Sequence, residues 1–171
     1  MIFEKLISGG QTGADRGALD AALSIGFPVG GFCPKGRRAE DGVIPERYPL
    51  QETASAEYPQ RTQWNVLEAD ATIIFTWGIP PSRGCALTDR LAKEAGKACG
   101  LIDIKEMSEE EAAEIVIAFI GHVGPLVLNV AGSRESKAPG IQTKVERIML
   151  RVFGHDWDKD KDKGKRFRLL K

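Results

Sequence analysis

The stretch IFEKLISGGQTGADRG, residues 2–17, opens the chain and decides its fold. The residues up to Ile7 are mostly apolar and suit a short strand, and glycines follow at the point where a strand would turn. Apolar residues then recur at helical spacing from Ala18 to Ile25, just before Gly26. The stretch therefore predicts a strand, a glycine turn and a helix in direct succession.

A glycine turn between a strand and a helix is suited to binding an anion, because backbone N–H groups and the helix N-terminus point at the same place. Its spacing matches neither the dinucleotide-binding nor the Walker fingerprint. An alternative is that the glycines serve only close packing of strand and helix. We expect Arg16 to pair with the anion and Asp15 to take a hydroxyl or a metal. The predicted binding residues of this turn are Gly9, Gly10, Gln11, Thr12, Gly13, Asp15 and Arg16.

Strand-like and helix-like segments alternate along the rest of the chain. We expect strands over residues 27–32, 71–77, 99–103 and 125–130, and helices over 57–69, 85–96, 108–120 and 140–153. Residues 33–49 are too rich in Gly, Pro and charge for regular structure. The alternation predicts an α/β fold: a Rossmann-like, doubly wound, mostly parallel sheet with helices on both faces. Ligands of such sheets bind outside the carboxyl ends of the strands.

Three further loops should open on the same edge as the first turn. The loop after residue 32 carries a basic cluster, which is suited to a phosphate or is simply solvated. The loop after residue 130 offers hydroxyls and cations for a second oxyanion, or caps a helix with a surface ion pair. The loop after residue 77 leads into another helix N-terminus. The predicted binding residues of these loops are Lys35, Gly36, Arg37, Arg38, Ser82, Arg83, Gly84, Gly132, Ser133, Arg134, Ser136 and Lys137.

Length and composition limit the class of protein. The 171 residues suit one ligand-binding domain over residues 1–154, followed by a charged tail over 155–171. Lys+Arg and Asp+Glu both number 24, which argues against nucleic acid or membrane as a partner held by bulk charge. The three cysteines are scattered, which is typical of reduced thiols in a cytoplasmic protein. We see no apolar run near the ~20 residues that a membrane span needs.

Catalytic residues are harder to find in this sequence. The two histidines, His122 and His155, lie away from the predicted ligand edge, which excludes a Ser-His-Asp triad. Cys85 lies at a helix N-terminus that should lower the pKa of its thiol, but no base accompanies it. The sequence therefore predicts neither a catalytic group nor a metal site, and a binding protein is favoured over an enzyme.

Four separated motifs resemble one known family. They are SGGQTGADRG at residues 8–17, CPKGRRAEDG at 33–42, RTxxNV at 61–66 and LNVAGxRESKxPG at 128–140. They are similar to the molybdenum carrier, or molybdenum-cofactor carrier, family within the SMF/DprA–LOG superfamily of Rossmann-like nucleotide binders. The resemblance covers about the first 150 residues. It implies a homo-oligomer that holds molybdopterin cofactor, or a related small phosphorylated ligand such as a nucleotide phosphate, and protects or delivers it.

One segment departs from the family pattern. The superfamily places a Gly-Gly-Thr type of turn before the fourth helix, where this chain has Ser82-Arg83-Gly84-Cys85. Two alternatives to a carrier therefore stay open. One is a hydrolase acting on a nucleoside monophosphate or an ADP-ribose-like compound through Asp15, Glu40 or Asp41. The other is a nucleotide sensor of the same superfamily.

Overall fold

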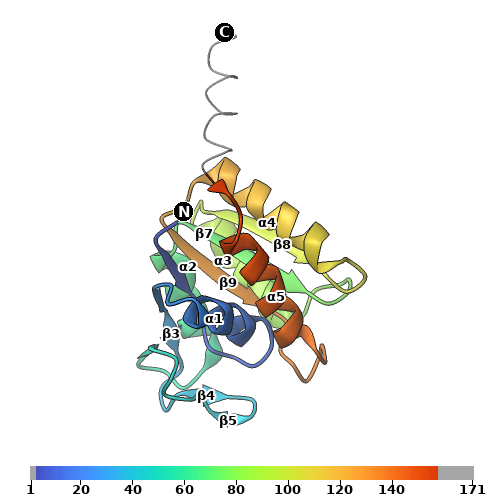
Figure 1. The fold of residues 1–171 in the computed structure, drawn as a ribbon. Helices are drawn as coiled ribbons and strands as arrows, with labels where there is room; N and C mark the ends of the chain where they lie inside the picture. The colour runs from blue at the N-terminus through green and yellow to red at the C-terminus, as the bar shows by residue number, and fades with distance from the viewer. Residues whose placement is uncertain (1–2, 158–171) are drawn as a thin grey trace.

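In the computed structural model, which describes residues 3–157, a five-stranded parallel sheet forms the centre of the molecule (Figure 1). Its order is β2–β1–β9–β7–β8, and every pair of neighbouring strands is parallel. The strands are β1 (Lys5–Ile7), β2 (Val29–Gly30), β7 (Ala71–Thr76), β8 (Ala98–Asp103) and β9 (Val127–Gly132). The last strand in the sequence, β9, thus lies in the middle of the sheet. The α/β, Rossmann-like fold is confirmed.

Helices cover both faces of this sheet. The helices α1 (Ala14–Ser24), α5 (Ile141–Phe153) and α4 (Glu109–Val123) pack side by side on one face, and α2 (Tyr58–Glu68) and α3 (Arg83–Glu94) pack together on the other. All six residues of β7 are buried between these layers. A parallel strand covered on both faces has this near-continuous apolar character.

The strand expected over residues 27–32 is wrong as a single element. It divides into β2, in the main sheet, and β3 (Phe32–Cys33), which pairs with β6 (Gln51–Glu52) in a small separate sheet. Gly31 lies at the break with φ of 123°, and a Cβ there would meet the Ser8 carbonyl oxygen at 2.1 Å. The chain bends at this glycine because only glycine adopts that backbone conformation so close to β1.

The expectation that residues 33–49 hold no regular structure is also corrected. They contain a short antiparallel hairpin of β4 (Arg38–Ala39) and β5 (Gly42–Val43). The hairpin carries Glu40 and Asp41 at its turn, which places both carboxylates beside the first glycine turn. The polar composition of the segment hid these two short strands.

Helix ends follow local capping chemistry. Ser108 and Glu111 form the predicted capping box at the start of α4. The helix α3 begins at Arg83, earlier than the predicted residue 85, because the Ser82 side chain caps it by accepting a hydrogen bond from the Cys85 N–H. Arg83 and Gly84 are therefore the first helical residues instead of loop residues.

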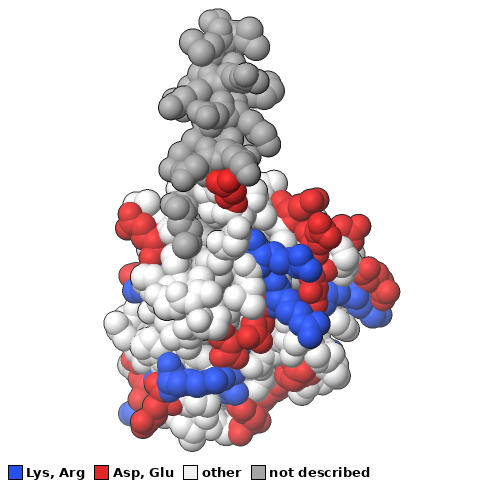
Figure 2. Space-filling view, viewed as in Figure 1, with Lys and Arg blue, Asp and Glu red and all other residues white. Residues whose placement is uncertain are grey.

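The described chain ends with Trp157 buried against the core, where its ring contacts His155 edge to face. Most of the predicted charged tail, residues 158–171, lies outside the described residues. Within residues 3–157, none of the helices has the length and apolar character needed to cross a membrane. On the face viewed in Figure 2, basic side chains lie beside acidic ones, as the equal numbers of the two charges imply.

Candidate functional site

A pocket of about 330 Å³ opens at the carboxyl ends of the central strands. Small-molecule sites range over about 300–1,000 Å³, so the pocket is large enough for one small ligand. It lies between the first turn, the helices α2 and α3, and the loop after β9. Its lining includes Gln11, Asp15, Tyr58, Arg61, Ser82, Arg83, Gly84, Thr88, Gly132, Arg134 and Lys137. The structure thus brings together residues from three of the four predicted loops.

The first glycine turn already holds an anion, the carboxylate of Asp15. Its Oδ2 accepts hydrogen bonds from the Gln11 N–H at 3.2 Å and from Arg61 Nη1 at 3.0 Å. Only 3% of the Asp15 side chain is exposed. Burial raises the pKa of Asp15, against the lowering effect of Arg61 and of the backbone N–H groups. A carboxylate of the chain therefore occupies the place where the sequence predicts a phosphate.

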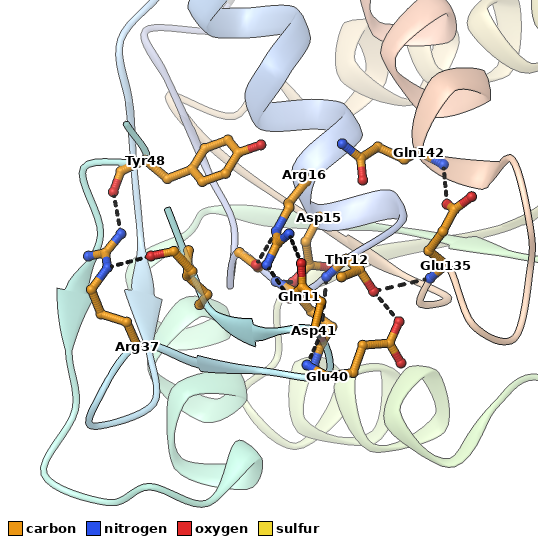
Figure 3. Close-up of polar contacts among 12 residues, drawn as sticks. Gln11, Thr12, Asp15, Arg16, Arg37, Glu40, Asp41, Tyr48, Glu135 and Gln142 are labelled. Carbon is orange, nitrogen blue, oxygen red and sulfur yellow. Dashed lines mark hydrogen bonds and ion pairs between the residues drawn. The ribbon is translucent and has the colours of Figure 1, made fainter. Parts of the chain in front are cut away.

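Arg16 also has a partner within the chain. Its guanidinium binds both oxygens of Asp41, at 2.6 and 2.8 Å, and its Nε donates to the Gly10 carbonyl oxygen at 3.0 Å (Figure 3). The Arg16 bond, partly offset by burial, holds the pKa of Asp41 below its ordinary value. Arg16 does not line the 330 Å³ pocket; it lines a separate hollow with Glu40 and Asp41. Its arrangement joins the β4–β5 hairpin to the first turn.

In the fourth loop, too, carboxylates of the chain accept hydrogen bonds from donors that the sequence assigns to a ligand. Glu40 accepts hydrogen bonds from the Ser136 N–H at 3.1 Å, from Ser136 Oγ at 2.5 Å and from the Thr12 hydroxyl. Burial raises the pKa of Glu40, but these hydrogen bonds outweigh burial and hold the pKa below its ordinary value. Glu135 accepts from the N–H groups of Gly140 and Gln142 at the start of α5. Of the donors expected to bind a second oxyanion, Ser136 and the N–H groups at the start of α5 thus bind carboxylates of the chain, whereas Ser133 faces Cys85 and Lys137 lines the pocket.

The motif glycines permit close packing. A Cβ on Gly13 would meet the Ser133 carbonyl oxygen at 2.4 Å, so the first and fourth loops touch there. A Cβ on Gly9 would lie 1.6 Å from Arg61 Nη1, and one on Gly132 would lie 2.3 Å from the Phe75 carbonyl oxygen. Gly10 has φ of 72°, and a Cβ there would meet Leu50 Cδ1 at 2.5 Å. These glycines let loops and side chains approach each other, which differs from the strand–helix packing that the alternative to a binding turn proposed.

Arginines surround Tyr58 at the side of the pocket. The guanidinium carbons of Arg38, Arg61 and Arg134 lie 5.5, 5.9 and 5.5 Å from the centre of its ring. The side chain of Arg61 is 13% exposed, whereas those of Arg38 and Arg134 are 54% and 40% exposed. Arg38 pairs with Glu57 at 3.5 Å, and Arg134 pairs with Glu40 at 3.7 Å. A guanidinium carries five N–H donors, so one such pair leaves donors for an incoming anion.

The N-terminus of α3 forms another part of the pocket wall. Ser82, Arg83 and Gly84 all line the pocket, and all three are exposed. Cys85 lies beneath them, with its Sγ 3.2 Å from Ser82 Oγ and 4.0 Å from the Oγ of the buried Ser133. The prediction of a lowered thiol pKa is wrong: burial, with a smaller contribution from the Asp15 carboxylate, raises the pKa of Cys85 more than the hydrogen bonds with Ser82 and Ser133 lower it.

The basic residues of the second loop, Lys35, Arg37 and Arg38, do not gather at one site. Arg37 turns inward and donates to the carbonyl oxygens of Ile44, Pro45, Tyr48 and Leu50 at 3.0, 3.0, 2.8 and 3.2 Å. Lys35 and Gly36 are exposed and lie outside the pocket lining. Only Arg38 of this cluster reaches the arginine group around Tyr58.

Seven residues that line the pocket were not among the predicted binding residues: Tyr58, Pro59, Arg61, Thr62, Leu87, Thr88 and Ala131. Tyr58 and Arg61 matter most for the chemistry of the site. Arg61 stands in the motif RTxxNV, which was a signal of the resemblance, and Tyr58 lies three residues before it in the same helix turn. The sequence does not show that α2 docks over the first glycine turn. Within the described residues, Arg61 Nε and Gln11 Nε2 are buried without a hydrogen-bond partner. A buried donor of this kind costs about 1–3 kcal/mol unless something accepts its hydrogen bond.

A larger hollow of about 820 Å³ lies between β8 and α4, lined by exposed side chains such as Lys105, Glu106 and Glu114. It is shallow and lies away from the four motifs. Across residues 3–157, no group of three or more His, Cys, Asp or Glu side chains is arranged to hold a metal ion. Neither histidine lines the 330 Å³ pocket. We therefore place the candidate site in the smaller pocket.

Comparison with known proteins gives two matches. Residues 6–153 match the model of the "Circularly permutated YpsA SLOG family". A crystal structure described as a "Putative molybdenum carrier protein", from Syntrophus aciditrophicus SB, is 44% identical, with a TM-score of 0.83. The match covers 89% of this chain and 95% of that chain. Among curated proteins, none matches.

Proposed function

Because this chain belongs to the circularly permutated YpsA SLOG family, we propose that its pocket binds a small phosphorylated ligand for storage or delivery. The first candidate for that cargo is the molybdenum cofactor, a phosphorylated pterin. A nucleotide phosphate is the second. The similar protein from Syntrophus aciditrophicus, with its description as a molybdenum carrier, supports this order.

The observation that carries the proposal is the arginine group around Tyr58. Arg134 lines the pocket together with the N-terminal residues of α3, and Arg38 lies against the other pocket residue that Arg134 contacts, Tyr58. Guanidinium groups bind phosphate through paired hydrogen bonds, and a helix N-terminus adds favourable dipole charge. We assign the phosphate of the ligand to Arg38 and Arg134, with Lys137, Ser82, Arg83 and Gly84 as further contacts.

The rest of the pocket suits a flat organic group. The Tyr58 ring forms part of the wall, and the volume of about 330 Å³ holds a bicyclic ring with a short side chain. The molybdenum cofactor fits the donor set, because its phosphate would meet the arginines and its pterin would contact Tyr58. The cofactor would bring its own metal chemistry, and the chain would hold and shield it.

Binding without turnover is favoured by the state of the carboxylates. Glu40 and Asp41, candidates for a hydrolase, are tied to Ser136, Thr12 and Arg16. Asp15 is held by Arg61 and the first turn. A general acid or base needs access to the proton that it transfers, and these groups are engaged in holding loops together.

The test is isothermal titration of the purified protein with molybdenum cofactor, AMP and ADP-ribose. We expect Arg134→Ala to lower the affinity for the ligand by about tenfold or more, since a charge-assisted hydrogen bond is worth ~1.5–3 kcal/mol. Arg147→Ala is the control, because Arg147 is an exposed arginine of α5 whose partner is Glu109. Equal affinity of the Arg134→Ala and Arg147→Ala variants would contradict the proposal. Cleavage of AMP or ADP-ribose would favour the hydrolase.

We also propose that the protein is a cytoplasmic homo-oligomer. The described cysteines are free thiols, which suits a reducing compartment. Apolar side chains are exposed on the sheet edge and on the outer helices, including Leu101 and Ile115 at 42% each and Leu67 at 52%. Light scattering during gel filtration should give a multiple of the 18.7 kDa chain mass. A mass of a single chain at micromolar concentration would contradict the assembly.

A further inference from the structure

The position of Asp15 determines which end of a ligand can bind at the floor of the pocket, by which we mean the part formed by the first glycine turn, Asp15 and Arg61. Asp15 follows the glycine turn directly, and its carboxylate turns back into that turn. The donors gathered there are the Gln11 N–H at 3.2 Å, the Gly9 N–H and Arg61 Nη1 at 3.0 Å. These are the groups that a phosphate or another tetrahedral oxyanion would need.

The floor of the pocket is therefore neutral overall. One buried negative group, Asp15 at 3% exposure, faces one buried positive group, Arg61 at 13% exposure. An oxyanion at the same donors would bring a second negative charge against the Asp15 carboxylate. Like charges placed together away from water repel by several kcal/mol. Burial already raises the pKa of Asp15, so even one negative charge is held there at some cost.

We propose that Asp15 is a specificity-determining residue that excludes inorganic oxyanions, such as phosphate and molybdate, from the pocket floor. It leaves the floor to the uncharged, hydrogen-bonding end of an organic ligand. This inference rests on the proposed function, because the phosphate of that ligand is assigned to Arg38 and Arg134. The cargo would then be an organic phosphorylated cofactor, and a bare oxyanion would be rejected.

The chemistry of the floor defines the complementary part of the ligand. The Asp15 carboxylate accepts hydrogen bonds, so it suits N–H or O–H groups of a heterocycle or a sugar. Gln11 lies next to it in the lining, only 5% exposed, and its Nε2 is among the described polar atoms without a hydrogen-bond partner. A carbonyl or ring nitrogen of the ligand would satisfy that donor. Asp15 and Gln11 together suit a ring that carries both donors and acceptors.

The test measures oxyanion binding by isothermal titration with molybdate and with inorganic phosphate. Asp15→Asn keeps the size of the side chain and removes its charge, which leaves Arg61 without its anion. We expect this variant to bind molybdate at least about tenfold more tightly than the wild type, because like-charge repulsion is removed. The double variant Asp15→Asn, Arg61→Met should lose that gain. An unchanged affinity in Asp15→Asn would overturn the proposal.

A matched control exists on the same helix. Asp20 accepts hydrogen bonds from Tyr48 at 2.7 Å and from Gln142 at 3.0 Å, and pairs with Arg47 at 3.0 Å, but it does not line the pocket. Asp20→Asn should therefore gain no affinity for molybdate. A gain in Asp20→Asn equal to that in Asp15→Asn would overturn the proposal, since it would show a general effect of lost negative charge.

The wild-type protein gives a test that needs no variant to fold. Crystals of the wild type are soaked in molybdate, and molybdenum is located by anomalous scattering. The proposal predicts no molybdenum at Arg61, and a molybdenum peak beside Arg61 would overturn it. If Asp15→Asn gains molybdate while no organic phosphate binds the wild type, the proposed carrier function fails and the role of Asp15 stands. If organic phosphates bind the wild type and Asp15→Asn gains no affinity for molybdate, the proposed carrier function stands and the role of Asp15 fails.

Discussion

At the scale of single residues, carboxylates of the chain occupy the places where the sequence suggests bound anions. The Asp15 carboxylate accepts hydrogen bonds within the first glycine turn, and the Glu40 carboxylate accepts those of Ser136. Asp41 neutralises Arg16, and Glu135 caps α5. At these positions, donors that the sequence assigns to a ligand phosphate are bound by carboxylates of the chain. A neighbouring aspartate or glutamate reaches such donors at little entropic cost, because it is already part of the chain.

Glu40 leads to a prediction about acid stability. Because its pKa is lowered in the folded protein, its contribution to stability is complete above its unfolded value near 4.5 and is lost as the pH falls through the folded value. Glu40→Gln should therefore lower the melting temperature at pH 7, and the difference from wild type should shrink below pH 4.5. Thermal unfolding across pH measures this. Glu46→Gln, exposed in the same loop, serves as the control, and a pH-independent difference for Glu40→Gln would contradict the argument.

Gly13 leads to a prediction about packing. It has φ of 83°, and a Cβ there would meet backbone of the fourth loop at 2.4 Å. We expect Gly13→Ala to lower the free energy of unfolding by about 3 kcal/mol or more, through backbone strain and a clash that cannot relax.

Gly36→Ala is the matched control for that prediction. Gly36 has φ of 75°, yet a Cβ there meets nothing within 4 Å. Its replacement should cost only the conformational strain, about 1 kcal/mol. Denaturant unfolding of both variants separates strain from clash, and equal losses would show that the first and fourth loops are not packed as described.

At the scale of elements, the second loop is divided between structure and binding. Arg37 holds the segment 44–50 through its backbone carbonyl groups, whereas its neighbour Arg38 faces Tyr58 at the pocket. Two adjacent arginines of one basic cluster therefore have different roles. The backbone conformation separates them, since Arg37 has a positive φ of 52° and turns its side chain inward.

This division leads to a prediction about a pair of variants. Arg37→Ala should speed hydrogen exchange in residues 44–50 and cost about 2 kcal/mol of stability, because several charged hydrogen bonds to backbone are lost. Its ligand affinity should stay within about twofold of the wild type. Arg38→Ala should do the opposite: it should lower the affinity for the ligand and leave hydrogen exchange in residues 44–50 unchanged. Hydrogen–deuterium exchange with mass spectrometry measures both variants, and the same pattern in the two would contradict the division.

The main elements could be predicted because their signals are local. The apolar run of β7 and the capping box of α4 both depend on a few consecutive residues. The break at Gly31 and the hairpin at Glu40 could not be predicted, because they result from contacts with β1 and the first turn. The role of Arg61 depends on how α2 docks across that turn, 46 residues distant in sequence from Asp15. No periodicity within α2 contains that information.

At the scale of the whole molecule, the parallel sheet gathers its loops at one edge, and the 330 Å³ pocket opens among them. Most charges of these loops cancel within the chain, which agrees with the equal totals of acidic and basic residues. At the pocket, Arg134 and Lys137 are in the lining and Arg38 lies against Tyr58; Arg38 and Arg134 each pair with a single carboxylate, at 3.5 and 3.7 Å. The fold thus concentrates its binding capacity for an anionic ligand in one place.

Whether the pocket holds an organic phosphate can be measured by native mass spectrometry of the protein purified from cells that make molybdenum cofactor. The proposed function predicts a retained organic ligand that carries phosphate, seen as added mass on the folded chain and lost in Arg134→Ala but not in Arg147→Ala. A protein that stays ligand-free even after incubation with molybdenum cofactor, AMP and ADP-ribose would contradict it. So would a ligand retained equally by the two variants.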